Sequence, residues 1–309
     1  MKLTQSQSEF LHSKKTPRSS LAGDRFEFLR ALVASGGPEV SDYQQLSTVL
    51  AWFHEVGFGE IVRRVLAPTL TVETMQGFSY LRPHGYSGDY EVIDRIYSFW
   101  HASDPQLIRW DQYFHAQTAP RAVRNRKAYF GALVDELDST SRDHVGQVLN
   151  IGSGPGRDIE EYLNAHPDVD VHIDSIDSDA KAVAFASQLC APHASRVAFN
   201  CLNALKYNPT KRYDLIWSAG LLDYFSERTF KMFVKRYYAA LAPGGSLVIG
   251  NFGPGNTSRA YMELVGDWHL HHRSRSALIA IGESCGVETS KIQVDEEAEG
   301  VNLFLRLRA

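Results

Sequence analysis

The most informative segment of the sequence is Val148-Leu149-Asn150-Ile151-Gly152-Ser153-Gly154-Pro155-Gly156-Arg157-Asp158. Its apolar start predicts a buried strand, its glycines predict a tight turn, and the residues after it predict a helix. Glycine permits backbone angles closed to other residues and lets a ligand approach the backbone closely. Amides at the start of a helix point at a polar ligand group. A structural turn between strand and helix has the same composition, so the loop alone leaves both readings open.

A carboxylate strengthens the interpretation of this loop as a ligand site. The next predicted strand ends in Ile176-Asp177-Ser178-Asp179, which places Asp177 about 25 residues after Gly152. An acid at the tip of the second strand can accept hydrogen bonds from both hydroxyls of a ribose, in dinucleotides and in S-adenosylmethionine (SAM) alike. The loop reads G-S-G-P-G, not the G-x-G-x-x-G of dinucleotide sites. A cofactor without a pyrophosphate needs only this shorter turn.

Strand and helix patterns alternate after residue 140. Seven strands are expected, at 147–151, 169–176, 197–201, 213–218, 246–250, 290–294 and 301–307, with helices at 159–164, 180–189 and 228–241. Such alternation predicts an α/β fold with a mostly parallel sheet, closed by an antiparallel pair of strands. Before residue 140 the patterns are helical, around 26–33 and over 42–66, 105–114 and 120–137. We therefore expect a helical domain over 1–140 and a sheet domain over 141–309.

Composition limits the classes of function. The 309 residues carry 36 acidic and 32 basic side chains, a net charge of −4, which disfavours general nucleic-acid binding. A solvated helix face explains the basic cluster Arg121, Arg124, Arg126 and Lys127 at least as well as an anion site does. The three cysteines fit no zinc pattern, and the N-terminus lacks the apolar run of a signal peptide. We expect a cytoplasmic protein without a membrane-spanning segment, for which a homodimer is one permitted assembly.

Taken in order, the motifs of residues 145–309 resemble those of class I SAM-dependent methyltransferases, including Leu241-Ala242-Pro243-Gly244-Gly245 before the fifth strand. The resemblance implies a Rossmann-like fold that binds SAM and releases S-adenosylhomocysteine (SAH). It implies that cofactor contacts come from the glycine loop, the second-strand acid, the segment after the third strand and the exit of the fourth. These residues are Gly152, Ser153, Gly154, Asp177, Ser178, Asn203, Ala204, Ser218, Ala219 and Gly220.

A second signature lies in the helical part, at Leu81-Arg82-Pro83-His84-Gly85-Tyr86-Ser87-Gly88-Asp89-Tyr90. Turn formers and polar groups between apolar helices favour a site, although Asp89 as a helix N-cap is an equally good interpretation. The segment resembles the K-P-x-G-Y-x-G-D motif of bacterial methyltransferases associated with methyl esters of 3-hydroxy fatty acids, the extracellular-factor type. Arg82 stands where that motif has Lys, and His84 is another departure. The resemblance implies a helical lid, with Arg82 binding substrate and Tyr86 and Asp89 in catalysis.

Substrate groups are expected beyond the carboxyl ends of the strands. We predict catalytic roles for Asp223 and His269, and substrate contacts from Tyr224, Asn251, Tyr261 and Arg273. Tyr86 and Tyr97 offer aromatic faces that attract a sulfonium cation. The three histidines between Asp267 and Arg273 lack an i, i+4 pairing with a carboxylate, so we predict no metal site.

Several functions stay open at this point. Carboxyl O-methylation of a 3-hydroxy fatty acid would need a long apolar tunnel, and N-methylation of an amino acid or guanidine-type metabolite would need a compact charged pocket. A dinucleotide-dependent oxidoreductase is disfavoured by the loop spacing. A nucleic-acid methyltransferase is disfavoured by Ser218-Ala219-Gly220-Leu221, which stands in place of an N-P-P-Y/F tetrapeptide. A non-catalytic module that kept the fold is the remaining alternative.

Overall fold

The computed structural model describes residues 17–140 and 144–309. Contacts divide the chain into two compact units. We call them the helical unit, made of Met1–Ser87, His101–Phe114 and Arg259–Trp268, and the sheet unit, made of Gly88–Trp100, His115–Ser258 and His269–Ala309. Each unit therefore combines segments distant in sequence. The predicted split of the chain into continuous domains at residue 140 stays a prediction.

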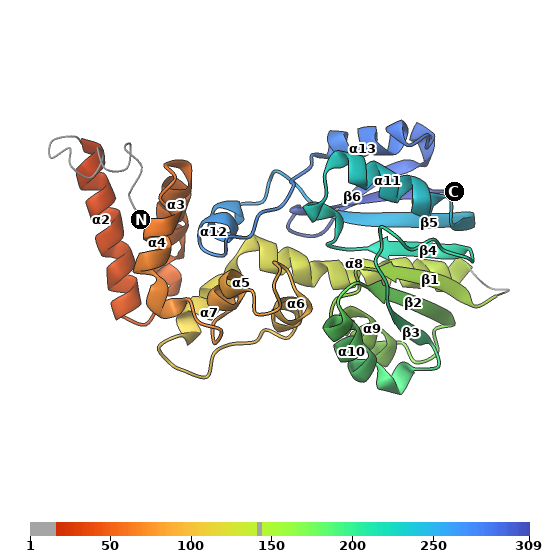
Figure 1. Ribbon diagram of the computed structural model, residues 1–309, viewed down its shortest axis with the longest axis horizontal. Helices are drawn as coiled ribbons and strands as arrows, with labels where there is room; N and C mark the ends of the chain where they lie inside the picture. The colour runs from red at the N-terminus through yellow and green to blue at the C-terminus, as the bar shows by residue number, and fades with distance from the viewer. Residues whose placement is uncertain (1–16, 141–143) are drawn as a thin grey trace. The chain divides into compact units, whose positions relative to one another are not determined.

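The sheet unit contains a seven-stranded sheet in the order β3-β2-β1-β4-β5-β7-β6 (Figure 1). Its strands are β1 Gly146–Ile151, β2 Val171–Asp177, β3 Val197–Cys201, β4 Tyr213–Ser218, β5 Leu241–Phe252, β6 Ile292–Glu296 and β7 Asn302–Arg308. The first five are parallel, and β7 runs antiparallel between β5 and β6. The predicted α/β class and closing antiparallel pair are confirmed. The strand order reverses between β1 and β4, which is where open α/β sheets bind ligands.

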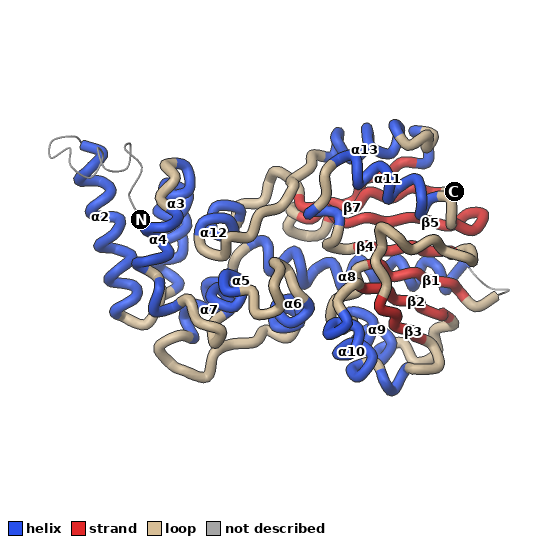
Figure 2. Tube along the Cα trace, in the orientation of Figure 1, coloured by secondary structure: helices blue, strands red, loops and turns tan. Residues whose placement is uncertain are grey.

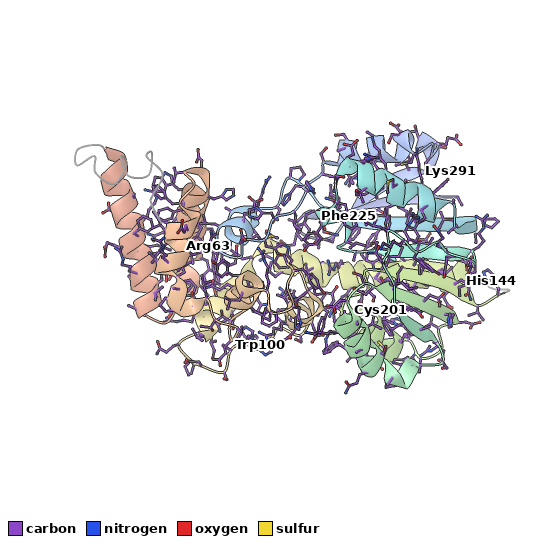
Figure 3. The ribbon with its side chains drawn as sticks, viewed as in Figure 1. Arg63, Trp100, His144, Cys201, Phe225 and Lys291 are labelled. Atoms are coloured by element: carbon purple, nitrogen blue, oxygen red, sulfur yellow. The ribbon has the colours of Figure 1, made fainter. Side chains whose placement is uncertain are left out.

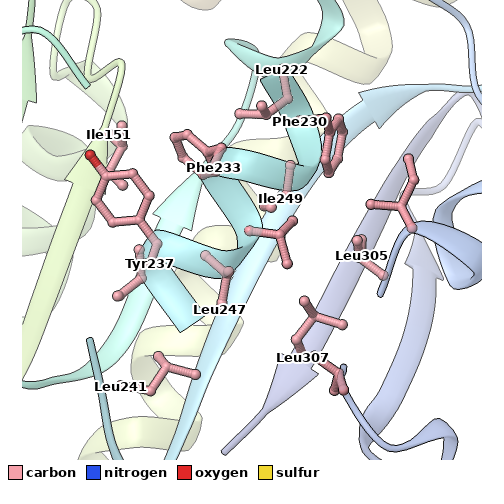
Figure 4. Close-up of a cluster of buried hydrophobic side chains, with 14 of the residues drawn as sticks. Ile151, Leu222, Phe230, Phe233, Tyr237, Leu241, Leu247, Ile249, Leu305 and Leu307 are labelled. Atoms are coloured by element: carbon pink, nitrogen blue, oxygen red, sulfur yellow. The ribbon is translucent and has the colours of Figure 1, made fainter. Parts of the chain in front are cut away.

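Helices cover both faces of this sheet. They are α8 Thr118–Thr140, α9 Arg157–Ala165, α10 Ala180–Leu189, α11 Glu227–Tyr238 and α13 Arg275–Ser284, and α6 Tyr90–Tyr97 packs on α8. Alternate residues of a strand face opposite sides, so Leu149 joins one buried cluster and Val148 another. Phe230, Phe233 and Tyr237 of α11 pack on the first face (Figure 4). Helices α8 and α9 contribute to the second cluster.

The start of β5 differs from the sequence-based expectation. A helix was predicted over 228–241, with a strand from 246, but α11 ends at Tyr238 and β5 begins at Leu241. Leu241 pairs with Tyr213, and the register then shifts before Ser246 pairs with Leu215. The turn at 243–245 is therefore an irregularity within the strand pair. Local periodicity did not reveal it because the pairing with β4 decides where the strand begins.

The helical unit has no strand among its described residues (Figure 2), which confirms the helical character predicted for the N-terminal part. Its elements are α2 Pro17–Ala34, η1 Val40–Asp42, α3 Tyr43–Glu55, α4 Gly59–Val65, η2 Ala67–Thr69, α5 Met75–Leu81, most of α7 Ile108–Ala116, and α12 Arg259–Leu264. His54 Nε2 on α3 lies 2.7 Å from Glu263 Oε2, and Arg63 donates to the Leu264 carbonyl at 2.8 Å. These contacts hold α12 to the unit. No helix of the described chain is long and apolar enough to cross a membrane.

Candidate functional site

The glycine loop joins β1 to α9 at the carboxyl edge of the sheet. The amides of Gly152 and Ser153 both donate to the Ile176 carbonyl, at 2.9 and 3.2 Å, which anchors the loop against the end of β2. The backbone angle φ is +67° at Gly152, +55° at Gly154 and +69° at Gly156. L-residues rarely adopt such angles. The loop therefore depends on glycine at all three places.

The three glycines differ in what surrounds them. A Cβ at Gly152 would lie 3.2 Å from the Leu221 side chain, and one at Gly156 would lie 3.0 Å from Ala186. At Gly154 a Cβ would meet no atom within 4 Å. Gly152 and Gly156 thus allow close packing, whereas Gly154 faces open space. This is the space that a ligand held by the loop would enter.

Asp177 is coupled directly to this loop. Its Oδ2 accepts from the Gly154 amide at 3.0 Å, and its Oδ1 accepts from the Asp179 amide at 2.9 Å. Burial raises the pKa of Asp177, and the backbone hydrogen bonds partly oppose that rise. Each carboxylate oxygen has two lone pairs, so each can accept one further hydrogen bond. Two ribose hydroxyls are the groups that this arrangement suits.

The other predicted cofactor residues follow the neighbouring strands. Leu202 donates its amide to the Asp177 carbonyl at 2.8 Å, so the exit of β3 lies beside that of β2. Asn203, which is exposed, accepts from the Leu205 amide at 2.9 Å and shapes the turn that includes Ala204. Ser178 is also exposed, at the tip of β2. These residues border the space next to the second strand, where the motifs of the sequence predict the nucleoside.

The hydroxyl of Ser218, which is predicted to lie among the cofactor residues, bonds to the sheet itself, and a cofactor contact from this residue stays a prediction. Its hydroxyl is fully buried and donates to the Ile151 carbonyl at 3.0 Å, which ties the end of β4 to the end of β1. Ala219 and Gly220 continue from there across the carboxyl edge. The side chain of Ser218 therefore supports the site from within the sheet.

The hydroxyl of Ser153 shows whether a polar ligand would fit at this edge of the sheet. The residue is 5% exposed, and its hydroxyl has no hydrogen-bonding partner in the part of the chain that the structure describes. Buried polar groups are normally paired, so such a hydroxyl indicates a partner supplied by another molecule. SAM carries hydroxyl, amino and carboxylate groups. The residues of this edge fit that cofactor.

The edge itself can be followed in Figure 3. Cys201 ends β3, and Phe225 follows η4 Leu222–Tyr224 beyond the end of β4. Both lie toward the carboxyl ends of the strands, whereas His144 lies before β1 at the opposite edge. The glycine loop, the tip of β2 and the exit of β4 therefore share one side of the sheet.

A comparison with protein families indicates the function of the residues along this edge. Residues 148–245 match a family model described as a methyltransferase domain. This chain is a SAM-dependent methyltransferase. The matched residues run from β1 to the turn within β5, and they include the glycine loop, Asp177 and the exit of β4. Its cofactor is therefore SAM, and its product is SAH.

Solved structures resemble the methyltransferase at low sequence identity. A possible exported protein from Bordetella parapertussis is 17% identical with a TM-score of 0.64, over 95% of this chain and 98% of that one. This likeness takes in most of the helical part as well as the sheet, so the fold occurs in another protein too. The magnesium protoporphyrin IX methyltransferase from Synechocystis with bound SAH is 12% identical over 62% of this chain and 87% of that one, with a TM-score of 0.49. No curated protein sequence matches the chain.

Asp223, predicted to be catalytic, lies inside the methyltransferase's sheet unit. It is 1% exposed, and its Oδ1 accepts from the Phe252 amide at 2.7 Å. Its carbonyl accepts from the His271 amide, also at 2.7 Å. Burial raises the pKa of this carboxyl to about 7. Asp223 thus joins η4 to the end of β5 and titrates near neutral pH.

The titration of Asp223 gives a pH-dependent stability. Its ordinary pKa is 3.8, so between about pH 4 and 7 the folded protein keeps a proton that the unfolded chain has lost. The stabilisation by the bound proton is complete below about pH 4 and is lost as the pH rises to about 7. Within this window the equilibrium constant for unfolding rises by about tenfold for each pH unit. Asp223→Asn cannot titrate. We expect its stability relative to the wild type to rise across this window, as measured by denaturant unfolding at several pH values. Parallel stability curves for the two proteins would contradict this.

Arg273 and Asn251, predicted to contact substrate, bond to each other. Arg273 Nη1 donates to Asn251 Oδ1 at 2.6 Å and to the Leu222 carbonyl at 3.1 Å, and Nη2 donates to the Phe225 carbonyl. Asn251 is fully buried, and its amide donates to the Phe252 and His271 carbonyls, both at 2.9 Å. The guanidinium is engaged by the chain's own oxygens. This geometry supports a structural role, joining the segment before α13 to the end of β5.

Arg82 and Tyr261 belong to the helical unit. Arg82 has φ of +49° at the end of α5, and its Nη2 lies 2.7 Å from Asp267 Oδ2. Tyr261 is buried and donates its hydroxyl to Gln76 Oε1 at 2.7 Å. Burial raises its pKa well above 10. Tyr86, from the same signature, is 40% exposed. The substrate roles of these residues stay predictions.

The remaining candidates lie in the sheet unit. Asp89 caps α6, since its Oδ1 accepts from the amides of Glu91 and Val92 at 2.9 and 3.0 Å, which confirms the capping interpretation. Tyr224 is 36% exposed in η4, and His269 is exposed. No group of three metal-ligating side chains occurs among the described residues.

The sequence left the basic cluster open between a solvated helix face and an anion site, and for Arg126 the structure excludes the solvated face. Arg126 is 8% exposed, and its Nε donates to the Tyr97 hydroxyl at 2.9 Å. Tyr97 is 6% exposed, and the Arg126 and Lys127 cations lie 5.6 and 4.8 Å from its ring centroid. The ring that was expected to attract a sulfonium already has two cations beside it. The signal that could have found Arg126 is its i, i+4 spacing with the apolar residue Phe130.

Proposed function

We propose that this methyltransferase transfers the methyl group of SAM to a carboxylate oxygen of a small acidic metabolite, with a 3-hydroxy fatty acid as the specific candidate. The supporting observation is that both carboxyls predicted to act in the sheet unit are bonded to backbone amides. Asp89 accepts from two amides of α6, and Asp223 accepts from Phe252. A carboxylate acceptor is already ionised near pH 7 and needs no base. The proposed reaction therefore requires no proton transfer to or from the carboxyls of Asp89 and Asp223.

The reaction would then rest mainly on positioning. Bound SAM supplies an electrophilic methyl group. One carboxylate oxygen forms a bond to the methyl carbon as the bond from that carbon to sulfur breaks, leaving a neutral methyl ester and SAH. The chain's part is to hold the donor: Asp177 accepts the ribose hydroxyls, the open face of Gly154 gives the donor room, and Ser153 bonds a polar group. These residues all lie in the sheet unit.

N-methylation is a second candidate because of one observation. An ammonium or guanidinium acceptor must lose a proton before it can attack the methyl group. Asp223, with a pKa of about 7, is a carboxyl that can take up a proton near neutral pH. A protein that uses it this way would lose turnover in Asp223→Asn while keeping its affinity for SAH.

The test uses the full chain with SAM labelled in its methyl group and an extract of small metabolites. Labelled products are isolated and treated with alkali, which releases methanol from methyl esters and leaves N-methyl groups intact. We expect alkali-labile label in acidic, lipid-soluble products. Alkali-stable label in basic products would support the second candidate. Absence of SAH binding in calorimetry would reject both.

A further inference from the structure

The position of Arg126 follows from the packing of α8 on the sheet. Phe130 of α8 packs against Trp217 of β4, with ring centroids 5.7 Å apart. Arg126 lies one helical turn before Phe130 and on the same face. Its side chain therefore reaches past the end of β4. A Cβ on Gly220 would lie 2.9 Å from Arg126 Nη1, which places the guanidinium against the loop that leaves this strand.

The guanidinium is buried but incompletely bonded. Arg126 is more than nine-tenths buried, and its one hydrogen bond is the donation from Nε to Tyr97. Among the residues that the structure describes, Arg126 has no hydrogen bond besides the one from Nε, and its Nη1 and Nη2 atoms stay accessible from outside the protein. Tyr97 accepts at its hydroxyl and donates to no described residue. Burial raises its pKa to about 12, so it keeps this proton. The N–H groups of Nη1 and Nη2 and the Tyr97 hydroxyl are therefore available to donate hydrogen bonds to a ligand.

Two buried acids lie within electrostatic range of Arg126, yet neither neutralises it. Asp158 and Asp223 both act on the guanidinium, but neither forms an ion pair with it. Burial raises the pKa of both carboxyls. A largely buried cation whose terminal donors have no protein partner is stabilised by an anion that reaches them. A side chain at Gly220 would require the guanidinium to shift, so Arg126 Nη1 lies directly against the exit of β4.

We propose that Arg126, held by Tyr97, binds a carboxylate at the exit of β4, where the planar guanidinium offers a two-pronged contact. The inference rests on SAM-dependent methyl transfer. Two molecules of that reaction can supply the carboxylate: the amino-acid part of the donor, or the acceptor of the proposed function. Both use the same chemistry, and the experiment separates them.

The experiment measures binding of SAH and of its decarboxylated analogue, which keeps the amine, by calorimetry. Three variants perturb the pair: Arg126→Lys keeps the charge but removes the fork, Tyr97→Phe removes the acceptor of Nε, and Gly220→Ala displaces the guanidinium. Arg121→Gln is the control, since Arg121 is on the same helix but pairs at the surface with Glu299. Thermal unfolding confirms that each variant folds. Labelled transfer to the metabolite extract is measured for all five proteins.

A donor carboxylate predicts that Arg126→Lys weakens SAH binding by about 10- to 100-fold, with a smaller loss for the decarboxylated analogue. An acceptor carboxylate predicts unchanged SAH binding and a loss of alkali-labile label by about the same factor. Tyr97→Phe and Gly220→Ala should lower the same quantity that Arg126→Lys lowers. Arg121→Gln should bind SAH and transfer label as the wild type does. Unchanged binding and transfer in all three variants would overturn the inference. So would equal losses for SAH and its decarboxylated analogue. A wild type that binds no SAH would instead reject the proposed function.

Discussion

Asp177→Ala is expected to weaken SAH binding by at least about 100-fold, because it removes the carboxylate that we propose accepts two charge-assisted hydrogen bonds from the ribose. It also removes the acceptor that holds the Gly154 amide at 3.0 Å, so the glycine loop loses its link to β2. Both effects act at the donor site. Isothermal calorimetry with SAH measures the affinity, and SAM turnover should fall in parallel.

Asp174→Asn is the matched control for this change. Asp174 is on the same strand, three residues before Asp177, and it accepts from the Tyr213 hydroxyl at 2.8 Å and pairs with Lys211 at 2.9 Å. It has no part in the loop. We expect this variant to lose some stability and to bind SAH as the wild type does. SAH affinity in Asp177→Ala within threefold of the wild type, roughly the uncertainty of one weak contact, would show that the acid does not hold the donor.

Gly154→Val is expected to abolish measurable SAH binding while leaving the protein folded. At φ of +55° an L-residue costs about 1–2 kcal/mol, and a β-branched one is the least tolerated. The new side chain would find no protein atom in its way, since nothing lies within 4 Å of a Cβ there. It would instead fill the space that we assign to the donor.

Gly244→Val separates strain from loss of the site. Gly244 has φ of +79° and likewise no atom within 4 Å of a Cβ, but it lies in the turn near the start of β5. The two variants should lose similar free energy of unfolding in denaturant titrations. Only Gly154→Val should lose SAH binding. Equal affinity for SAH in the two variants would mean that the open side of Gly154 is not the donor site.

Elements with strong local signals were predictable from sequence. The helix over 180–189 and the strands over 197–201 and 213–218 have the predicted bounds. The helix begins where Asp179 accepts from the Lys181 amide, which is a local capping interaction. Pattern and cap act over a few neighbouring residues, so the chain carries this information without reference to the rest of the fold.

Features that depend on distant partners were not predictable in this way. The start of β5 depends on its pairing with Tyr213, and the interleaving of segments in the two units depends on where α12 returns. Arginine is a residue type that usually lies at the protein surface, and the neighbours Arg121 and Lys127 do form ion pairs with partly exposed acids. The burial of Arg126 comes from the contact between α8 and β4. The residue type at position 126 does not predict the packing of α8 on β4, so the burial of Arg126 could not be predicted from the sequence.

The order of strands and helices along the chain, the glycine loop and the acid at the tip of β2 all follow from the amino-acid sequence. Periodicity, capping and glycine conformation are properties of short segments, so they can be recognised along the chain. The open space beside Gly154, which the other two loop glycines lack, and the burial of Arg126 follow from the folded arrangement instead. Both depend on which distant side chains fill the volume around a residue, and packing sets that volume after the segments have come together.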